Sequence, residues 1–174
     1  LWNTGGVRIC SRVSVNPMAA IARGIPLARE KQAEIIPRLI LSIDAATEDV
    51  DEFGKVRTWG HIAALFLQME FEAGESFPTI LKSICTESVD ELYDDFVTEN
   101  FPLIVATLAA SSDDFAAAID DRNVNDYVRG SLVGAVFGMV CEGRISREQA
   151  IPFLCNRLSA AVDSHDSHIG FCAK

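Results

Sequence analysis

A short apolar pattern recurs four times along the chain, and its spacing limits the folds that are open to the sequence. Each copy has an apolar residue, then proline or alanine, then a polar or small residue, then two more apolar residues. The copies begin 41, 38 and 36 positions apart, at Ile36, Phe77, Phe115 and Ile151. Repeats of this length are typical of two-helix units that stack side by side. The spacing therefore predicts an all-α protein, an α-solenoid of about four helical hairpins.

Helix start signals agree with this arrangement. Two segments, from Ser88 to Glu91 and from Ser146 to Gln149, have the capping-box pattern, in which two side chains satisfy free backbone donors at a helix start. We expect four prolines in the first turn of helices, where no intrahelical donor is lost: Pro37, Pro78, Pro102 and Pro152. No segment alternates with a period of two, so we expect no sheet. We predict helices near residues 26–46, 57–73, 77–85, 89–98, 100–110, 113–121, 125–141 and 147–162.

Length and hydropathy favour one repeat domain. The chain has 174 residues, of which 49% are hydrophobic, enough for one continuous core. We expect residues 1–25 to form a poorly defined segment, residues 26–162 the repeat domain, and residues 163–174 a flexible tail. No apolar run approaches the roughly 20 residues of a membrane span, so we expect no membrane contact. The five cysteines include no Cys-x-x-Cys pair, which favours reduced thiols and a cytoplasmic location.

Negative charge is concentrated in one part of the chain. Eleven acids and one base lie between Glu87 and Asp126, so this acidic belt carries the whole formal net charge of −10. Such a belt repels phosphate backbones, and we expect no nucleic-acid partner. Acids four positions apart on a helix repel one another unless a positive group neutralises them. The belt is either a solvated, solubilising face or a dock for a basic partner, for which the candidate residues are Asp90, Glu91, Asp94 and Asp95.

One segment carries a family resemblance. The residues from Asn125 to Arg129 resemble the Asp-x-x-Val-Arg opening of the second helix in HEAT-like repeats, and Arg57 holds a similar place in an earlier unit. Residues of about 26 to 158 resemble a bacterial domain-of-unknown-function family of HEAT-like hairpins. The segments that carry this resemblance are 57–65, 77–81, 120–129 and 143–148.

The resemblance implies a HEAT/ARM-like α-α superhelix. Members of the family often carry a C-terminal SEC-C zinc motif, which this chain lacks, because no paired-cysteine cluster follows Leu158. In HEAT-like arrays the Asp and Arg residues of adjacent repeats commonly pair. The resemblance therefore implies structural ion pairs at Arg57, Asp126 and Arg129, although Asp126 and Arg129 are also placed to pair within one helix.

The sequence contains no complete catalytic or metal-binding motif. Serine-hydrolase, dinucleotide and P-loop motifs do not occur. The His-Glu dipeptides of HEAT-like di-iron hydroxylases are also absent, because none of the three histidines is followed by Glu. His165, His168 and Cys172 have a spacing that suits zinc, but a disordered tail is the favoured interpretation. We therefore expect no metal and no cofactor. An unrecognised enzyme or small-molecule binder stays as the alternative, with a pocket between helices near Trp59, His61 and Tyr93.

The sequence thus predicts a non-catalytic interaction or scaffolding module in the cytoplasm. Its partner is expected to be a protein, and a basic one if the acidic belt is the docking surface. Solenoid ends need polar caps, yet Leu154, Leu158 and Val162 are apolar, so a homodimer through the last helix is a further hypothesis.

Overall fold

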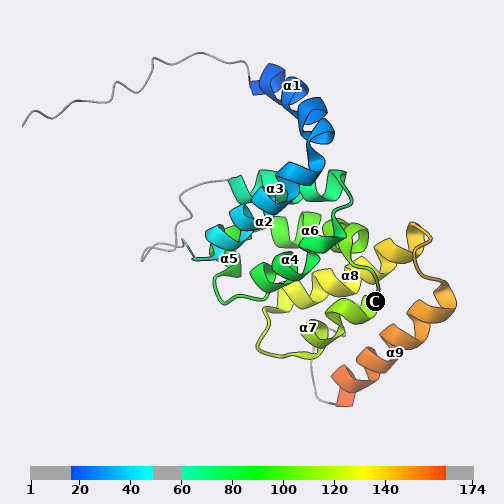
Figure 1. The fold of residues 1–174 in the computed structure, drawn as a ribbon. Helices are drawn as coiled ribbons and strands as arrows, with labels where there is room; N and C mark the ends of the chain where they lie inside the picture. The colour runs from blue at the N-terminus through cyan, green and yellow to red at the C-terminus, as the bar shows by residue number, and fades with distance from the viewer. Residues whose placement is uncertain (1–16, 49–59, 164–174) are drawn as a thin grey trace, which may run out of the picture. The chain divides into compact units, whose positions relative to one another are not determined.

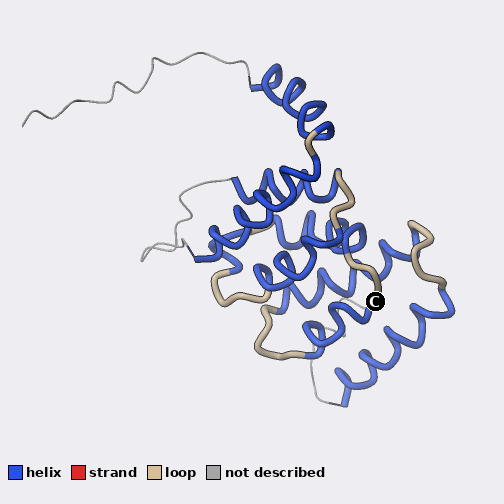
Figure 2. Tube along the Cα trace, in the orientation of Figure 1, coloured by secondary structure: helices blue, strands red, loops and turns tan. Residues whose placement is uncertain are grey.

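The computed structural model describes the backbone of residues 17–48 and 60–163, and the side chains of residues 24–48 and 60–160. Every regular element in these ranges is a helix, and no strand occurs there, as expected (Figure 2). The chain divides between Gln32 and Ala33 into two units, and each is described by itself.

The first unit contributes one helix, and the second contributes the rest (Figure 1). In chain order the described elements are α1 (Pro17–Glu30), α2 (Gln32–Glu48), α3 (Gly60–Glu70), the 3-10 turn η1 (Gly74–Ser76), α4 (Phe77–Ile84), α5 (Val89–Tyr93), α6 (Phe96–Leu108), the 3-10 turn η2 (Ser112–Phe115), α7 (Ala116–Asp120), α8 (Asp126–Cys141) and α9 (Arg147–Asp163).

Helix bounds agree with the prediction for α4, α8 and α9 and differ elsewhere. Helix α1 begins at Pro17, within the segment expected to be poorly defined, and a turn at Lys31 divides the helix expected over residues 26–46. The break expected near residue 99 lies instead at Asp94, whose φ of 47° is left-handed and ends α5. With a ψ of −136° this is a conformation that residues other than glycine rarely adopt, and it turns the chain between α5 and α6.

The expected placement of the prolines is right at one position and wrong at three. Pro78 is in the first turn of α4. Pro37, Pro102 and Pro152 instead lie inside α2, α6 and α9. An interior proline removes one backbone hydrogen bond and normally costs about 3 kcal/mol, so packing must offset that cost. The ring of Pro102 lies against Gly134 of α8.

Of the two capping boxes predicted from the sequence, one forms and the other does not. At Ser146 both bonds of the capping box form, 2.9 Å from its N–H to Gln149 Oε1 and 3.3 Å from the Gln149 N–H to Ser146 Oγ. Ser88 begins α5 without a side-chain cap, so the box expected there is wrong. A box that the sequence analysis missed, Ser111 with Asp114, begins η2.

The core of the second unit is centred on α6 and α8. These two helices form the most extensive contact between described elements, α3 packs on the other side of α6, and α9 packs on α8 (Figure 1). Helix α8 has apolar or small residues around most of its circumference and is correspondingly buried, as expected for a central helix. The largest fully buried apolar side chains are Phe101, Phe115, Ile43, Leu65, Ile80, Ile84, Leu92, Ile104, Ile119, Leu132 and Met139.

The first residues of the recurring pattern share one environment in three copies. Ile36, Phe77 and Phe115 are 6%, 5% and 0% exposed, whereas Ile151 in the last copy is 54% exposed. The rings of Phe77 and Phe115 contact each other edge to face, with centroids 6.3 Å apart. Equivalent positions in successive copies therefore pack on one another at this place in the core.

Candidate functional site

The four acidic residues singled out from the sequence lie on α5 and in the turn that follows it. Asp90 and Glu91 are on the helix, Asp94 ends it, and Asp95 precedes α6. All four are exposed. The structure therefore brings these carboxylates together on one short stretch of surface, here called the acidic surface.

Buried apolar residues hold this stretch in place. Val89, Leu92 and Tyr93 are buried at i, i+3 and i+4, which leaves the acids on the opposite side of α5. The Asp94 N–H donates to the carbonyl of Asp90 at 3.0 Å, and the left-handed turn then directs the chain into α6. The acidic surface thus has buried apolar side chains on its inner side.

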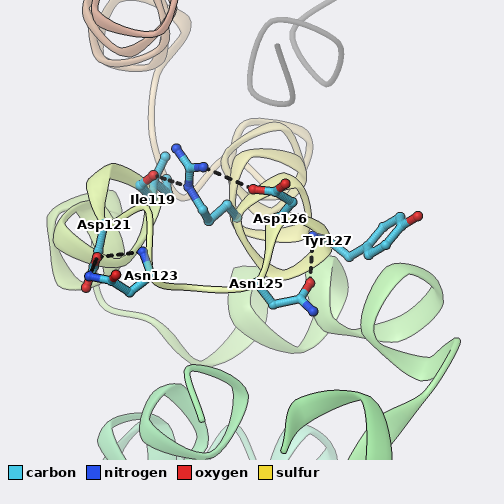
Figure 3. A network of polar contacts seen from close by, with 7 residues as sticks. Ile119, Asp121, Asn123, Asn125, Asp126 and Tyr127 are labelled. Carbon is cyan, nitrogen blue, oxygen red and sulfur yellow. Dashed lines mark hydrogen bonds and ion pairs between the residues drawn. The ribbon is translucent and has the colours of Figure 1, made fainter. Parts of the chain in front are cut away.

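One neutral side chain links the acidic surface to the next hairpin. Asn125 Nδ2 donates to the carboxylate of Asp90, at 3.2 Å and 3.4 Å from the two oxygens. Asn125 Oδ1 accepts from the Tyr127 N–H at 2.9 Å and so begins α8. Figure 3 shows this cap beside a second turn, in which Asn123 donates to Asp121 Oδ1. Within the described part of the chain, no ion pair reaches any of the four acids of the surface.

Arg129 is the buried charge of this region. Its Nε donates to the carbonyl of Ile119 at 2.9 Å, next to the end of α7, and Nη1 lies 3.2 Å from Asp126 Oδ1 (Figure 3). The structure therefore pairs Asp126 and Arg129 within α8, at i and i+3. Arg57, the third residue assigned to structural ion pairs, lies outside the described residues.

Among the described residues, three polar side-chain pairs between elements were not predicted from the sequence. Each joins residues about one repeat apart in the sequence. The pairs are Asp44 with Lys82 at 2.8 Å and a separation of 38, Asp90 with Asn125 at a separation of 35, and Asp120 with Arg157 at 3.3 Å and a separation of 37. Their spacing matches that of the apolar pattern, and this match was the signal that could have identified them.

His61 and Tyr93, proposed to line a pocket, are both core residues. Their rings meet edge to face with centroids 5.5 Å apart, and both side chains are buried. His61 Nε2 lies 3.0 Å from the carbonyl oxygen of Leu92, and the Tyr93 hydroxyl donates to Ser83 Oγ at 2.8 Å. Protein groups thus occupy the bonding directions that a ligand would use. Trp59 lies outside the described residues.

Within residues 17–48 and 60–163, no group of three or more His, Cys, Asp and Glu side chains is placed to hold a metal ion. His165, His168 and Cys172 lie outside this range. None of the helices described there is long and apolar enough to cross a membrane.

Together these features define a protein that is helical throughout its described residues, with an exposed acidic surface beside a buried apolar core. Residues 11–171 match a family described as "Protein of unknown function (DUF1186)", and the chain belongs to this family. This confirms the expected membership of a family of unknown function.

Two chlamydial proteins are similar to the chain. It is 24% identical over 146 residues to an "Uncharacterized protein" of Chlamydia trachomatis serovar D and 23% identical over 146 residues to one of Chlamydia muridarum. In both cases the alignment covers 82% of this chain but 58% and 59% of the relative, so the chain spans less than two thirds of their length. No solved structure matches the chain.

Proposed function

We propose that the chain is a HEAT-like repeat module that binds a basic protein partner through its acidic surface. The repeat interpretation is supported by the recurring apolar pattern, by the contact of Phe77 with Phe115 at equivalent positions, and by polar pairs 35 to 38 residues apart. A stack of about four hairpins that buries its apolar faces internally leaves a long outer surface for a partner.

The observation that carries the binding proposal is the exposure of Asp90, Glu91, Asp94 and Asp95 on one short stretch, with no ion pair to any of them in the described residues. Like charges placed this closely raise the free energy of the free protein by a few tenths of a kcal/mol per pair. A partner that brings Lys or Arg to the surface removes this repulsion. It also gains electrostatic steering, which acts on association rate and specificity more than on affinity.

The negative charge of the acidic belt also determines which class of partner we propose. Eleven acids against one base between Glu87 and Asp126 disfavour nucleic acid and favour a basic protein. We place the module in the cytoplasm because Cys85, Cys141 and Cys155 are free thiols. We propose a non-catalytic role, since the buried titratable pair His61 and Tyr93 is engaged by protein groups.

The test is a binding comparison between two charge-matched variants. Partners recovered from native lysate by the wild type are identified, purified and measured by calorimetry against a variant in which the surface is neutralised: Asp90→Asn, Glu91→Gln, Asp94→Asn and Asp95→Asn. The control neutralises four exposed acids elsewhere: Glu30→Gln, Glu34→Gln, Glu48→Gln and Glu75→Gln.

We expect the surface variant to lose affinity and salt dependence, and the control to keep most of both, because nearby charges interact most strongly. Equal binding by the wild type and the surface variant would remove the acidic surface from the proposal. Circular dichroism of both variants checks that the helices are intact.

A further inference from the structure

A groove lies between the C-terminal half of α8 and the N-terminal half of α9. It holds a volume of about 210 Å³, and apolar side chains form most of its wall. Two of them, Phe137 and Ile151, are 50% and 54% exposed. The lining residues are Phe137, Val140, Cys141, Arg147, Ala150, Ile151 and Leu154.

The position of Ile151 in the repeat pattern indicates that this groove lacks a covering apolar surface. The equivalent residues Ile36, Phe77 and Phe115 are buried, and Phe77 and Phe115 cover each other across successive copies. Within the described residues no element covers Ile151. Its exposure leaves apolar surface in water, at a cost proportional to the area, which a second apolar surface would remove.

The groove is better suited to side chains from another protein surface than to a small molecule. Its volume is below the roughly 300 to 1,000 Å³ of typical small-molecule sites. Its wall offers one charged group, the Arg147 guanidinium, which forms no ion pair within the described part of the chain. The nearby Arg144 is already engaged, because it donates to the carbonyls of Ala106 and Ala109.

We propose that the groove is the interface of a two-fold homodimer, in which the α8–α9 face of one copy packs on the same face of the other. Charge allows this face to meet a second copy. Residues 142–160 carry three bases and two acids, a net charge of +1, so the repulsion between two copies here is small compared with that between two acidic belts. Exposed Glu142 follows the lining residue Cys141, and it supplies the carboxylate that Arg147 of the other copy lacks.

A two-fold interface uses one patch twice, so each of its residues acts in both copies. Phe137 and Ile151 of one copy then contact the apolar lining of the other. This surface includes Leu154, one of the three residues expected from the sequence to form a dimer. Leu158 is half-buried, and the side chain of Val162 lies outside the described residues.

The mass of the particle in solution tests the proposal. Light scattering coupled to gel filtration, with sedimentation equilibrium over a concentration series, should give twice the chain mass of 19.0 kDa for the wild type. Phe137→Glu and Ile151→Glu should each halve this mass. The matched control is Leu41→Glu, at an apolar residue of α2 that is 66% exposed, and it should stay dimeric.

Two results would overturn the proposal. One is a wild type that stays at 19.0 kDa up to its solubility limit. The other is a dimer whose mass neither groove variant changes, since that dimer uses another surface. Far-UV circular dichroism checks that all three variants keep their helices, which we expect because the substituted side chains are exposed.

Cys141 offers a second readout, because it lines the groove and is exposed. A chain in which the other four cysteines are Ser should form a covalent dimer with a short bis-maleimide, and adding Phe137→Glu should abolish it. Cross-linking that persists after Phe137→Glu contradicts the assigned interface.

Discussion

Gly138 on α8 faces Ala106 on α6 so closely that a β-carbon added at Gly138 would lie 2.9 Å from the β-carbon of Ala106. Four positions earlier, a β-carbon at Gly134 would lie 3.5 Å and 3.6 Å from the Cβ and Cγ atoms of Pro102, which is ordinary contact. Two glycines on one face of α8 thus let the central helices approach, but only one of them is required by sterics.

We expect Gly138→Ala to lower the free energy of unfolding by about 1–3 kcal/mol, because neither Cβ atom can rotate away and the helices must separate. Gly134→Ala is the matched control. It should be neutral or stabilising by up to about 1 kcal/mol, since alanine favours the helix and meets no clash. Urea unfolding followed by circular dichroism measures both, and equal effects at the two sites would contradict the close approach.

Arg129 and Asp126 form an ion pair in which one side chain is buried and the other is exposed. Arg129 keeps 5% of its side chain exposed, against 52% for Asp126. Arg129→Met should destabilise the protein by roughly 3 kcal/mol, because the Ile119 carbonyl loses its donor and the Asp126 carboxylate loses its base. Asp126→Asn should cost less than about 1 kcal/mol, as expected for an exposed partner. The same urea measurement compares them, and a larger loss for Asp126→Asn would be inconsistent with this assignment.

Local sequence signals predicted the helical class well. The bounds of α4, α8 and α9 follow from hydrophobic periodicity and from the capping box at Ser146, which depend on neighbouring residues alone. The exposure of Asp90 and Glu91 also follows from periodicity, because Val89, Leu92 and Tyr93 determine which side of α5 is buried.

Features that depend on tertiary packing could not be predicted in the same way. The ring of Pro102 inside α6 packs against Gly134, a residue more than thirty positions away in the sequence. The pairing of Asp44 with Lys82 likewise depends on how α2 and α4 lie in the folded chain. The apolar helix around His61 favours a buried, hydrogen-bonded ring, but its partner, the Leu92 carbonyl, lies 31 residues away and depends on tertiary packing. Tertiary contacts override local propensity at each of these positions.

The raised pKa of the buried Tyr93 hydroxyl predicts a loss of stability at alkaline pH. Burial raises the pKa of the Tyr93 hydroxyl from 10.0 to about 12, against a smaller lowering by its bond to Ser83. The unfolded chain therefore loses this proton first, so the stabilising contribution is complete below pH 10 and is lost as the pH rises towards about 12. Urea unfolding across this range should show the decline in wild type, and Tyr93→Phe should reduce it.

The ionisation itself can be followed by ultraviolet absorbance. The chain has two tyrosines, so a Tyr127→Phe variant leaves Tyr93 as the reporting group. Its folded state should titrate near pH 12 and its urea-unfolded state near pH 10. Coincident titrations in the two states would contradict the buried hydroxyl.

Cys85 should be the least reactive thiol among the described cysteines. Burial, and to a lesser extent the negative charge of Asp121, raise the pKa of its thiol from 9.0 to about 11. Because the thiolate is the reactive form, a rise from 9.0 to about 11 lowers the thiolate population near neutral pH about 100-fold.

Chains that retain Cys85 alone or the exposed Cys155 alone, with every other cysteine changed to Ser, can be compared with a disulfide reagent under pseudo-first-order conditions. The Cys85 chain should react at least about 100-fold more slowly, and the difference should collapse in urea, where both thiols meet water. A Cys85 rate equal to that of Cys155 in the folded protein would mean that the core around α4 opens faster than the reagent reacts.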